Sequence, residues 1–182
     1  MKFTHWIALF SQTGSEIADL SSALNRTPDF VITNANFDQV DSRVNVDFRV
    51  NKEEAKTLDI LENLDFNNDN TLITLNGWLK IVPSDKCKNY NIYNGHPGLI
   101  TKYPELKGKD PQQRAWDDMH KYDVVGSVVH KVVEEVDAGE IVREEFIPST
   151  NLLTLDDTYD ALRVTSFTSW YSFLKERLYN KV

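Results

Sequence analysis

Short apolar runs alternate with stretches of helical periodicity along the first two thirds of the chain. An apolar run of four to eight residues that ends at turn residues is typical of a buried strand. Apolar positions three or four residues apart, such as Ile17, Leu20 and Leu24, indicate a helix. Strands are expected at 5–11, 29–36, 45–50, 70–79 and 90–94, and helices at 15–26 and 52–64.

In the last third of the chain, strands and helices no longer alternate one by one. A helix is predicted at 111–121, which begins with proline, a favoured residue at a helix start. Two β-rich runs follow at 125–137 and 139–148, and a long amphipathic helix at 155–179 ends the pattern. Alternating strands and helices predict an α/β fold with a Rossmann-like, mainly parallel twisted sheet and helices on both faces. We expect one domain over residues 1–182, closed by a β-hairpin and the last helix.

Composition narrows the choice of partners. The net charge of −8 argues against nucleic acid and anionic membranes, which select basic surfaces. The apolar run near the N-terminus is too short for a signal peptide or a membrane span. The one cysteine, Cys87, excludes an internal disulfide and a cysteine metal cluster. We therefore expect a soluble, cytoplasmic protein that is a monomer or a homodimer.

In a sheet of this kind, ligands bind beyond the carboxyl ends of the strands. Four loops are expected to meet there, at 11–16, 34–36, 76–82 and 94–98. The functional residues are sought first in these loops.

Asn94 and His96 stand just past a predicted strand end and before Pro97-Gly98. An asparagine amide can donate hydrogen bonds to an oxyanion, and a histidine can act as general acid or base near neutral pH. The competing interpretation is an Asn-Gly turn beside a histidine with a structural role. Both stay open on the residues alone.

Asp137 is the second candidate, in a turn between the two β-rich runs. A carboxylate near an imidazole would orient the ring and favour its charged form. Asp before Ala-Gly is also ordinary turn chemistry. His130 lies within an apolar run and is interpreted as a satisfied core histidine.

The loop at 11–16 opens a predicted helix. Backbone amides at such a position bind phosphate, whereas the simpler interpretation is that Ser15 caps the helix. Glu16 would favour the helix dipole but repel a phosphate. No spacing indicates a metal site, and no P-loop is present, so no metal is expected.

Taken together, these segments resemble the folate-dependent formyltransferase family. The family signature Asn-x-His-Pro is matched by NGHPGLI at 94–100, and its distant aspartate by EVDAGEIV at 135–142. The preceding strand Gly-x-x-x-His is matched by GSVVH at 126–130. The segment LNGWLKIVP at 75–83 matches the end of the family's fourth strand, and KYPEL at 102–106 resembles the loop after the signature.

The resemblance implies a mechanism with 10-formyltetrahydrofolate as cosubstrate and a small-molecule amine as acceptor. Asn94 and His96 would hold the oxyanion, and Asp137 would orient His96 and assist proton transfer. The acceptor would lie near Gly14, Ser15, Lys107 and Lys109, with Arg114 in the same basic segment. The folate would lie against Trp78, Leu79, Lys80, Ile81 and Val82 on one side, and Val133, Glu134 and Val136 on the other.

Several positions depart from the family pattern. In the phosphate loop of the glycinamide ribonucleotide enzymes, Gly14 and Ser15 match, but the first glycine and both asparagines do not. Gly95 replaces an apolar residue and Gly98 a serine, from which we expect a more flexible loop. The acidic chain ends soon after its last predicted helix, which disfavours a tRNA substrate.

Three functions remain in view. The first is formyl transfer to a small amine, with glycinamide ribonucleotide, an intermediate of purine biosynthesis, as the best acceptor and an amino sugar nucleotide as the alternative. The second is hydrolysis of 10-formyltetrahydrofolate. The third is a folate-binding module without catalysis, against which the intact Asn94, His96 and Asp137 argue.

Overall fold

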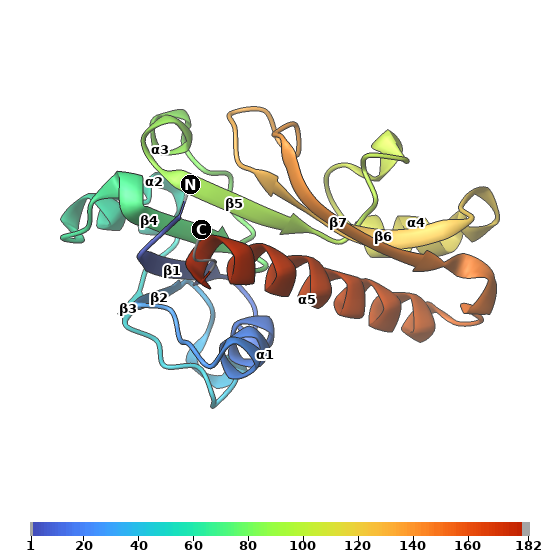
Figure 1. Ribbon diagram of the computed structural model, residues 1–182, viewed down its shortest axis with the longest axis horizontal. Coiled ribbons are helices and arrows are strands. Elements are labelled where there is room, and N and C mark those ends of the chain that lie inside the picture. The colour runs from blue at the N-terminus through green and yellow to red at the C-terminus, as the bar shows by residue number, and fades with distance from the viewer. Residues whose placement is uncertain (1, 180–182) are drawn as a thin grey trace.

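A seven-stranded sheet runs through the molecule in the computed structural model, which describes residues 2–179 (Figure 1). The strand order is β3-β2-β1-β4-β5-β6-β7. The strands are β1 (His5–Phe10), β2 (Phe30–Thr33), β3 (Phe48–Arg49), β4 (Thr71–Leu75), β5 (Asn91–His96), β6 (Val124–Lys131) and β7 (Ile141–Pro148).

Parallel pairing joins β3, β2, β1, β4 and β5, and antiparallel pairing adds β6 and β7 at one edge. The predicted mainly parallel sheet with a closing hairpin is therefore confirmed. The carboxyl ends of β1, β4 and β5 meet at the same edge, so the loops that follow them lie together.

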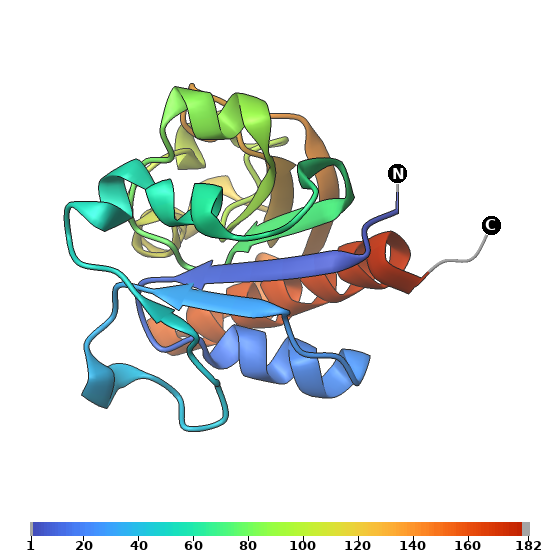
Figure 2. The same ribbon diagram turned by 90° about the vertical axis from the view of Figure 1, so that its left-hand side faces the viewer.

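Helices cover both faces of the sheet. Helices α1 and α5 pack on one face, and α2, α3 and the 3₁₀ turn at Asp59–Asn63 pack on the other (Figure 2). The helices are α1 (Ser15–Leu24), α2 (Glu54–Thr57), α3 (Ser84–Asn89), α4 (Pro111–Asp117) and α5 (Leu155–Tyr179). Within residues 2–179, no helix combines the length and apolar character that crossing a membrane requires.

Strand β1 shows why the sheet is covered twice. Trp6, Ala8 and Phe10 face the cluster under α1 and α5, while Ile7 and Leu9 face the opposite cluster. Successive side chains of a strand point to opposite faces, so an unbroken apolar run needs cover on both. Each large side chain buried in this way stabilises the fold by about 1.5–3 kcal/mol.

The helices predicted at 15–26, 52–64 and 111–121 are all shorter than expected. The helix predicted at 52–64 breaks at Leu58, whose backbone is left-handed with a φ of 54° and whose side chain is fully buried. Burial of this leucine outweighs the continuity of the helix.

Helix α1 begins after the left-handed Gly14 without a side-chain cap, so Ser15 is its first residue and the capping interpretation is wrong.

The placement of Asn94 and His96 beyond a strand end is also wrong. Both residues lie inside β5, where they pair with β6, and the Asn-Gly turn is excluded. Residues two apart in a strand share one face, so the strand itself aims both side chains in the same direction. The turn begins only at Pro97.

Gly95 has a packing role. A β-carbon added there would lie 2.4 Å from Nε1 of Trp170, a fully buried indole on α5. The indole therefore fills the space that an apolar side chain would take. Gly98 is constrained as well, because an added β-carbon would lie 3.1 Å from His96 Nε2.

Gly95→Ala is expected to destabilise the protein by about 1–3 kcal/mol, because the new methyl group overpacks against Trp170. Urea unfolding of the wild type, Gly95→Ala, Trp170→Phe and the double variant would measure the effect. The double variant should cost less than the sum of the two single changes. Simple additivity would contradict this account of Gly95.

Candidate functional site

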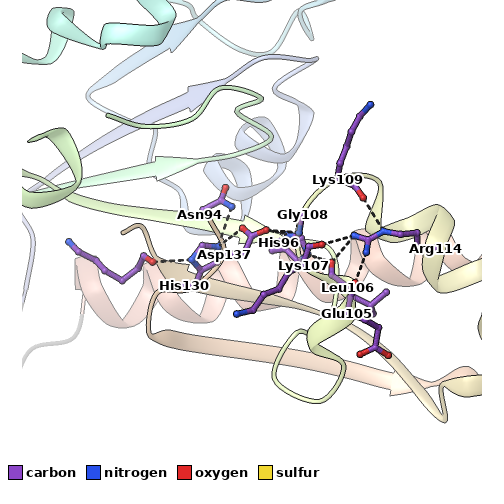
Figure 3. A network of polar contacts seen from close by, with 11 residues as sticks. Asn94, His96, Glu105, Leu106, Lys107, Gly108, Lys109, Arg114, His130 and Asp137 are labelled. Atoms are coloured by element: carbon purple, nitrogen blue, oxygen red, sulfur yellow. Dashed lines mark hydrogen bonds and ion pairs between the residues drawn. The ribbon is translucent and has the colours of Figure 1, made fainter. Parts of the chain in front are cut away.

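The site is built on the pairing of β5 with β6. Asn94 lies directly opposite His130 in this antiparallel ladder, and directly opposite residues share a face. His96 stands on the same face two residues further on. The register therefore places one amide and two imidazoles side by side (Figure 3).

Asp137 completes the cluster from the loop at 132–140. Its backbone is left-handed, with a φ of 53°, and only 8% of the residue is exposed. Its carboxylate oxygens lie 3.4 Å from His96 Nδ1 and 3.3 Å from His130 Nε2. The backbone N–H of Gly108 donates a hydrogen bond to the same carboxylate over 2.9 Å.

Tight folding of the loop explains this approach. A β-carbon on Gly139 would lie 1.7 Å from the carbonyl oxygen of Lys131, so only glycine fits there. The N–H of Lys131 donates to the carbonyl of Glu140 over 2.8 Å and closes the loop. Asp137 is thereby turned back onto the end of β6.

Neighbouring carbonyl oxygens fix the protons of both imidazoles, because a carbonyl can only accept. His96 Nε2 lies 2.9 Å from the Leu106 carbonyl, and His130 Nδ1 lies 2.9 Å from the Lys131 carbonyl. These two nitrogens therefore carry hydrogens. His96 Nδ1 and His130 Nε2 are left facing Asp137.

The Asn94 amide keeps one N–H for a ligand. Its Nδ2 lies 3.3 Å from His130 Nε2, which accepts one hydrogen while that imidazole is neutral. An amide nitrogen carries two hydrogens, so the second stays available to an incoming oxygen.

Burial and charge act in opposite directions at this site. Burial lowers the pKa of His96, and the neighbouring Asp137 only partly opposes the effect. Burial alone would raise the pKa of Asp137. The pKa is lowered overall, because the Gly108 N–H donates to the carboxylate and because either imidazole, when protonated, attracts its charge, with His130 Nε2 then also donating to it. Asp137 is thus ionised at neutral pH, beside a His96 that favours its neutral form.

The interpretation of His130 as a satisfied core histidine is confirmed, but it is incomplete. Its side chain is buried, yet it contacts both Asn94 and Asp137. The GSVVH segment carried the signal, but the sequence does not define which residue of β5 pairs with His130.

A cleft of about 410 Å³ opens near the end of β5, and its lining includes Gly95 and Pro97 but none of the four cluster side chains. Gly14 and Ser15 line the same cleft, and their role as acceptor contacts stays a prediction. The cleft wall also includes Gln12, Thr13, Glu16, Asn76, Gly77, Gln112, Tyr159, Asp160, Leu162, Arg163 and Ser166. Three of the four predicted loops, at 11–16, 76–82 and 94–98, contribute to it.

The basic segment is arranged differently from the prediction. Lys107 and Lys109 are exposed, and neither lines the cleft. Arg114 is turned inward and donates hydrogen bonds to backbone carbonyls. The two lysines remain predicted acceptor contacts, whereas an anion-binding role for Arg114 does not fit its position.

Glu16 projects into the cleft wall from the first turn of α1. Its carboxylate accepts hydrogen bonds from Asn76 Nδ2 over 2.9 Å and from Ser166 Oγ over 2.6 Å. Burial is the main effect and raises the pKa of Glu16, against the lowering by these two donors. The residue ties α1 and α5 to the loop that follows β4 and brings a carboxyl group into the wall of the cleft.

The segment at 78–82 divides into two faces. Trp78 and Val82 are buried in the core, while Leu79 and Ile81 are 65% and 74% exposed. Only the outward pair can therefore offer apolar side-chain surface to a flat ring. Lys80 lies between them.

The loop at 133–136 faces outward too and is linked to the same region. Val133 and Val136 are exposed, and Glu134 accepts a hydrogen bond from Ser84 Oγ over 2.9 Å.

Within residues 2–179, no group of three or more His, Cys, Asp or Glu side chains is placed to hold a metal ion.

The fold and site define a class of protein. Residues 4–171 match the family model described as formyl transferase, and the chain belongs to this family. The resemblance inferred from the sequence is thereby confirmed.

Individual relatives are similar to parts of the chain. A phosphoribosylglycinamide formyltransferase of Dictyostelium discoideum is 37% identical over 94 residues, which are 47% of this chain and 44% of the relative. A mitochondrial formyltetrahydrofolate deformylase of Arabidopsis thaliana is 29% identical over 52% of this chain and 26% of the relative. The aligned part of the chain thus spans less than half of either relative.

The fold also has solved counterparts. Glycinamide ribonucleotide transformylase 1 from Geobacillus kaustophilus superimposes with a TM-score of 0.78 at 19% identity, over 97% of this chain and 99% of that one. At this identity the comparison establishes the shared fold.

Glu16→Gln is expected to stabilise the protein at pH 8. A carboxyl group whose pKa is raised in the folded state stabilises fully below its unfolded pKa, and this contribution is lost as pH rises through the folded pKa. Glutamine keeps a hydrogen-bonding group without the charge. Urea midpoints at pH 8 should therefore rise, and the difference should shrink at pH 3.5.

Glu135→Gln is the matched control, since the Glu135 side chain is exposed. It should leave both midpoints nearly unchanged. A lower midpoint for Glu16→Gln at pH 8 would show that the ionised carboxylate stabilises the fold.

Proposed function

We propose that this chain transfers the formyl group of 10-formyltetrahydrofolate to a primary amine of a small molecule, with glycinamide ribonucleotide as the first acceptor to test. The observation that carries the proposal is the buried, ionised Asp137 between two imidazoles, one of which also contacts Asn94. An amide donor, a titratable donor and an acceptor carboxylate are the groups that acyl transfer needs.

Asn94 is the donor to the formyl oxygen. Its amide nitrogen carries a second hydrogen besides the one directed at His130 Nε2, and this hydrogen would be donated to the formyl oxygen. His96 joins Asn94 once its Nδ1 is protonated, because its Nε2 hydrogen is held by the Leu106 carbonyl. Together they stabilise the negative charge that develops on that oxygen.

Asp137 is the proton acceptor. A primary amine that attacks the formyl carbon must lose a proton as the new C–N bond forms. The bond between the formyl carbon and the folate nitrogen then breaks, and that nitrogen takes up a proton to leave as tetrahydrofolate. The carboxylate is ionised at neutral pH and lies within reach of both imidazoles, so it can take this proton directly or through His96 Nδ1.

The folate site is assigned to the two outward-facing loops. Leu79, Ile81, Val133 and Val136 are exposed apolar side chains of a kind that fits a flat pterin. Bound there, the cosubstrate supplies an activated one-carbon unit. Trp78 and Val82 are buried in the core behind this surface and would support it by packing.

The choice of acceptor follows the relatives, of which one is named a phosphoribosylglycinamide formyltransferase. An amino sugar nucleotide is the alternative. We place the protein in the cytoplasm as a monomer or homodimer in purine biosynthesis, without a metal or a nucleic-acid partner. Hydrolysis is the second candidate function, because another relative is named a deformylase.

An assay of tetrahydrofolate release separates these functions. Purified protein with 10-formyltetrahydrofolate is expected to turn over only when glycinamide ribonucleotide is added. Turnover with no amine present would establish the hydrolase instead. Folate binding without turnover, across glycinamide ribonucleotide and a panel of amino sugar nucleotides, would contradict both activities.

Asn94→Ala, His96→Ala and Asp137→Asn are each expected to lower turnover by about 100- to 1000-fold, the typical cost of losing one preorganised group. Steady-state kinetics would measure the loss. His120→Ala changes an exposed histidine and is the control. Retention of full activity by Asp137→Asn would remove the proton-acceptor role.

Glu16→Gln is expected to lower the KM for glycinamide ribonucleotide at pH 8 by about 3- to 10-fold, since one like charge across a solvated cleft is worth on the order of 1 kcal/mol. The KM for glycinamide riboside, which lacks the phosphate, should not change. Equal effects on both compounds would place the phosphate away from Glu16.

A further inference from the structure

The Arg114 guanidinium donates hydrogen bonds to four backbone carbonyls within the loop at 105–109. From α4, its Nε donates to Lys109 O over 3.0 Å, and its Nη2 donates to Leu106 O over 3.1 Å and Lys107 O over 2.8 Å. Its Nη1 donates to Glu105 O. The loop at 105–109 is thereby wrapped around one planar group (Figure 3).

The same loop reaches the site at two points. The Leu106 carbonyl accepts the hydrogen of His96 Nε2 over 2.9 Å. The Gly108 N–H donates to Asp137 over 2.9 Å. Backbone groups of this one loop thus contact two of the three ionisable members of the cluster, His96 and Asp137.

We propose that Arg114 is a positioning residue, which holds the Leu106 carbonyl against His96 Nε2 and so keeps His96 Nδ1 free of hydrogen and facing Asp137. The kinetic part of the proposal rests on the proposed formyl transfer. The part that concerns the proton of His96 does not depend on any reaction.

One oxygen atom links the two side chains. The Leu106 carbonyl has two lone pairs, one for His96 and one for the Arg114 guanidinium. Because the guanidinium is planar and its donors have fixed directions, the loop cannot shift without losing several hydrogen bonds together. The carbonyl is therefore held more firmly than a single contact would hold it.

The position of the hydrogen on His96 depends on this carbonyl. Asp137 lies 3.4 Å from Nδ1, and its negative charge would favour a hydrogen on that nitrogen. The Leu106 carbonyl favours the hydrogen on Nε2 instead. If the carbonyl moves away, Asp137 is the remaining acceptor, and the neutral ring is expected to change tautomer.

Electrostatics act in the same direction as the geometry. Burial is the main cause that lowers the pKa of His96, and the positive charge of Arg114 adds to it. The guanidinium therefore helps to keep the His96 ring neutral. Only a neutral ring has two tautomers, because a protonated ring carries hydrogen on both nitrogens.

Nitrogen-15 NMR of the imidazoles tests the proposal without substrate. The wild type should show His96 with hydrogen on Nε2 in its neutral form, and Arg114→Gln should move it to Nδ1. The signal is assigned by its loss in His96→Ala. Arg26→Gln is the matched control, because Arg26 also donates to a backbone carbonyl, that of Thr4, at the other end of β1.

Kinetics give the second measurement. Arg114→Gln should lower kcat by about 10- to 100-fold, as expected when a reacting group is misplaced. The KM values should change by less than about threefold, since no substrate contact is removed. Arg114→Lys keeps the charge but cannot match four carbonyls, so it should recover only part of the loss.

Two results would overturn the proposal. One is a wild-type tautomer and wild-type kcat in Arg114→Gln. The other is full recovery by Arg114→Lys, which would reduce the role to charge. If Arg114→Gln does not fold, Arg114→Lys decides by the same NMR signal. If the wild type transfers no formyl group, the proposed function fails, and the tautomer still decides the role of Arg114.

Discussion

The need to stabilise one buried carboxylate organises the site. Asp137 is almost fully removed from water, and an isolated charge in that position would be neutralised by a proton. The two imidazoles and the Gly108 N–H lower its pKa and keep it ionised. Each of these partners comes from a different segment, so the carboxylate holds β5, β6 and the loop at 105–109 in place.

The pairing of β5 with β6, and not the geometry of a loop, orients the Asn94 and His96 side chains. Asn94 and His96 were predicted on a loop, whose turn would aim them. They lie instead inside β5, where alternation places them on one face and the ladder with β6 places His130 beside them. A strand ladder is more rigid than a loop. Electrostatic stabilisation of a charged oxygen atom requires hydrogen-bond donors that are held in fixed positions.

Local patterns predicted the parts of this molecule that depend on neighbouring residues. The alternating elements, the long last helix and the residue types at 94, 96 and 137 could all be read from the sequence. His130 and Arg114 could not, because their roles depend on the β5–β6 register and on a loop folding around a guanidinium. The break at Leu58 was missed because core burial overrode a local helical pattern.

Departures from the family pattern are linked through α5. Trp170 fills the space over Gly95, and Ser166 donates to Glu16. Ser166 and Trp170 stand four residues apart, so they share one face of the helix. Changes at two distant positions of the chain therefore meet one helical surface, along the same cleft. A change in the packing of α5 would therefore reach Gly95 and Glu16 together, while the contacts of Asp137 with His96 and His130 come from β5, β6 and the loop at 132–140.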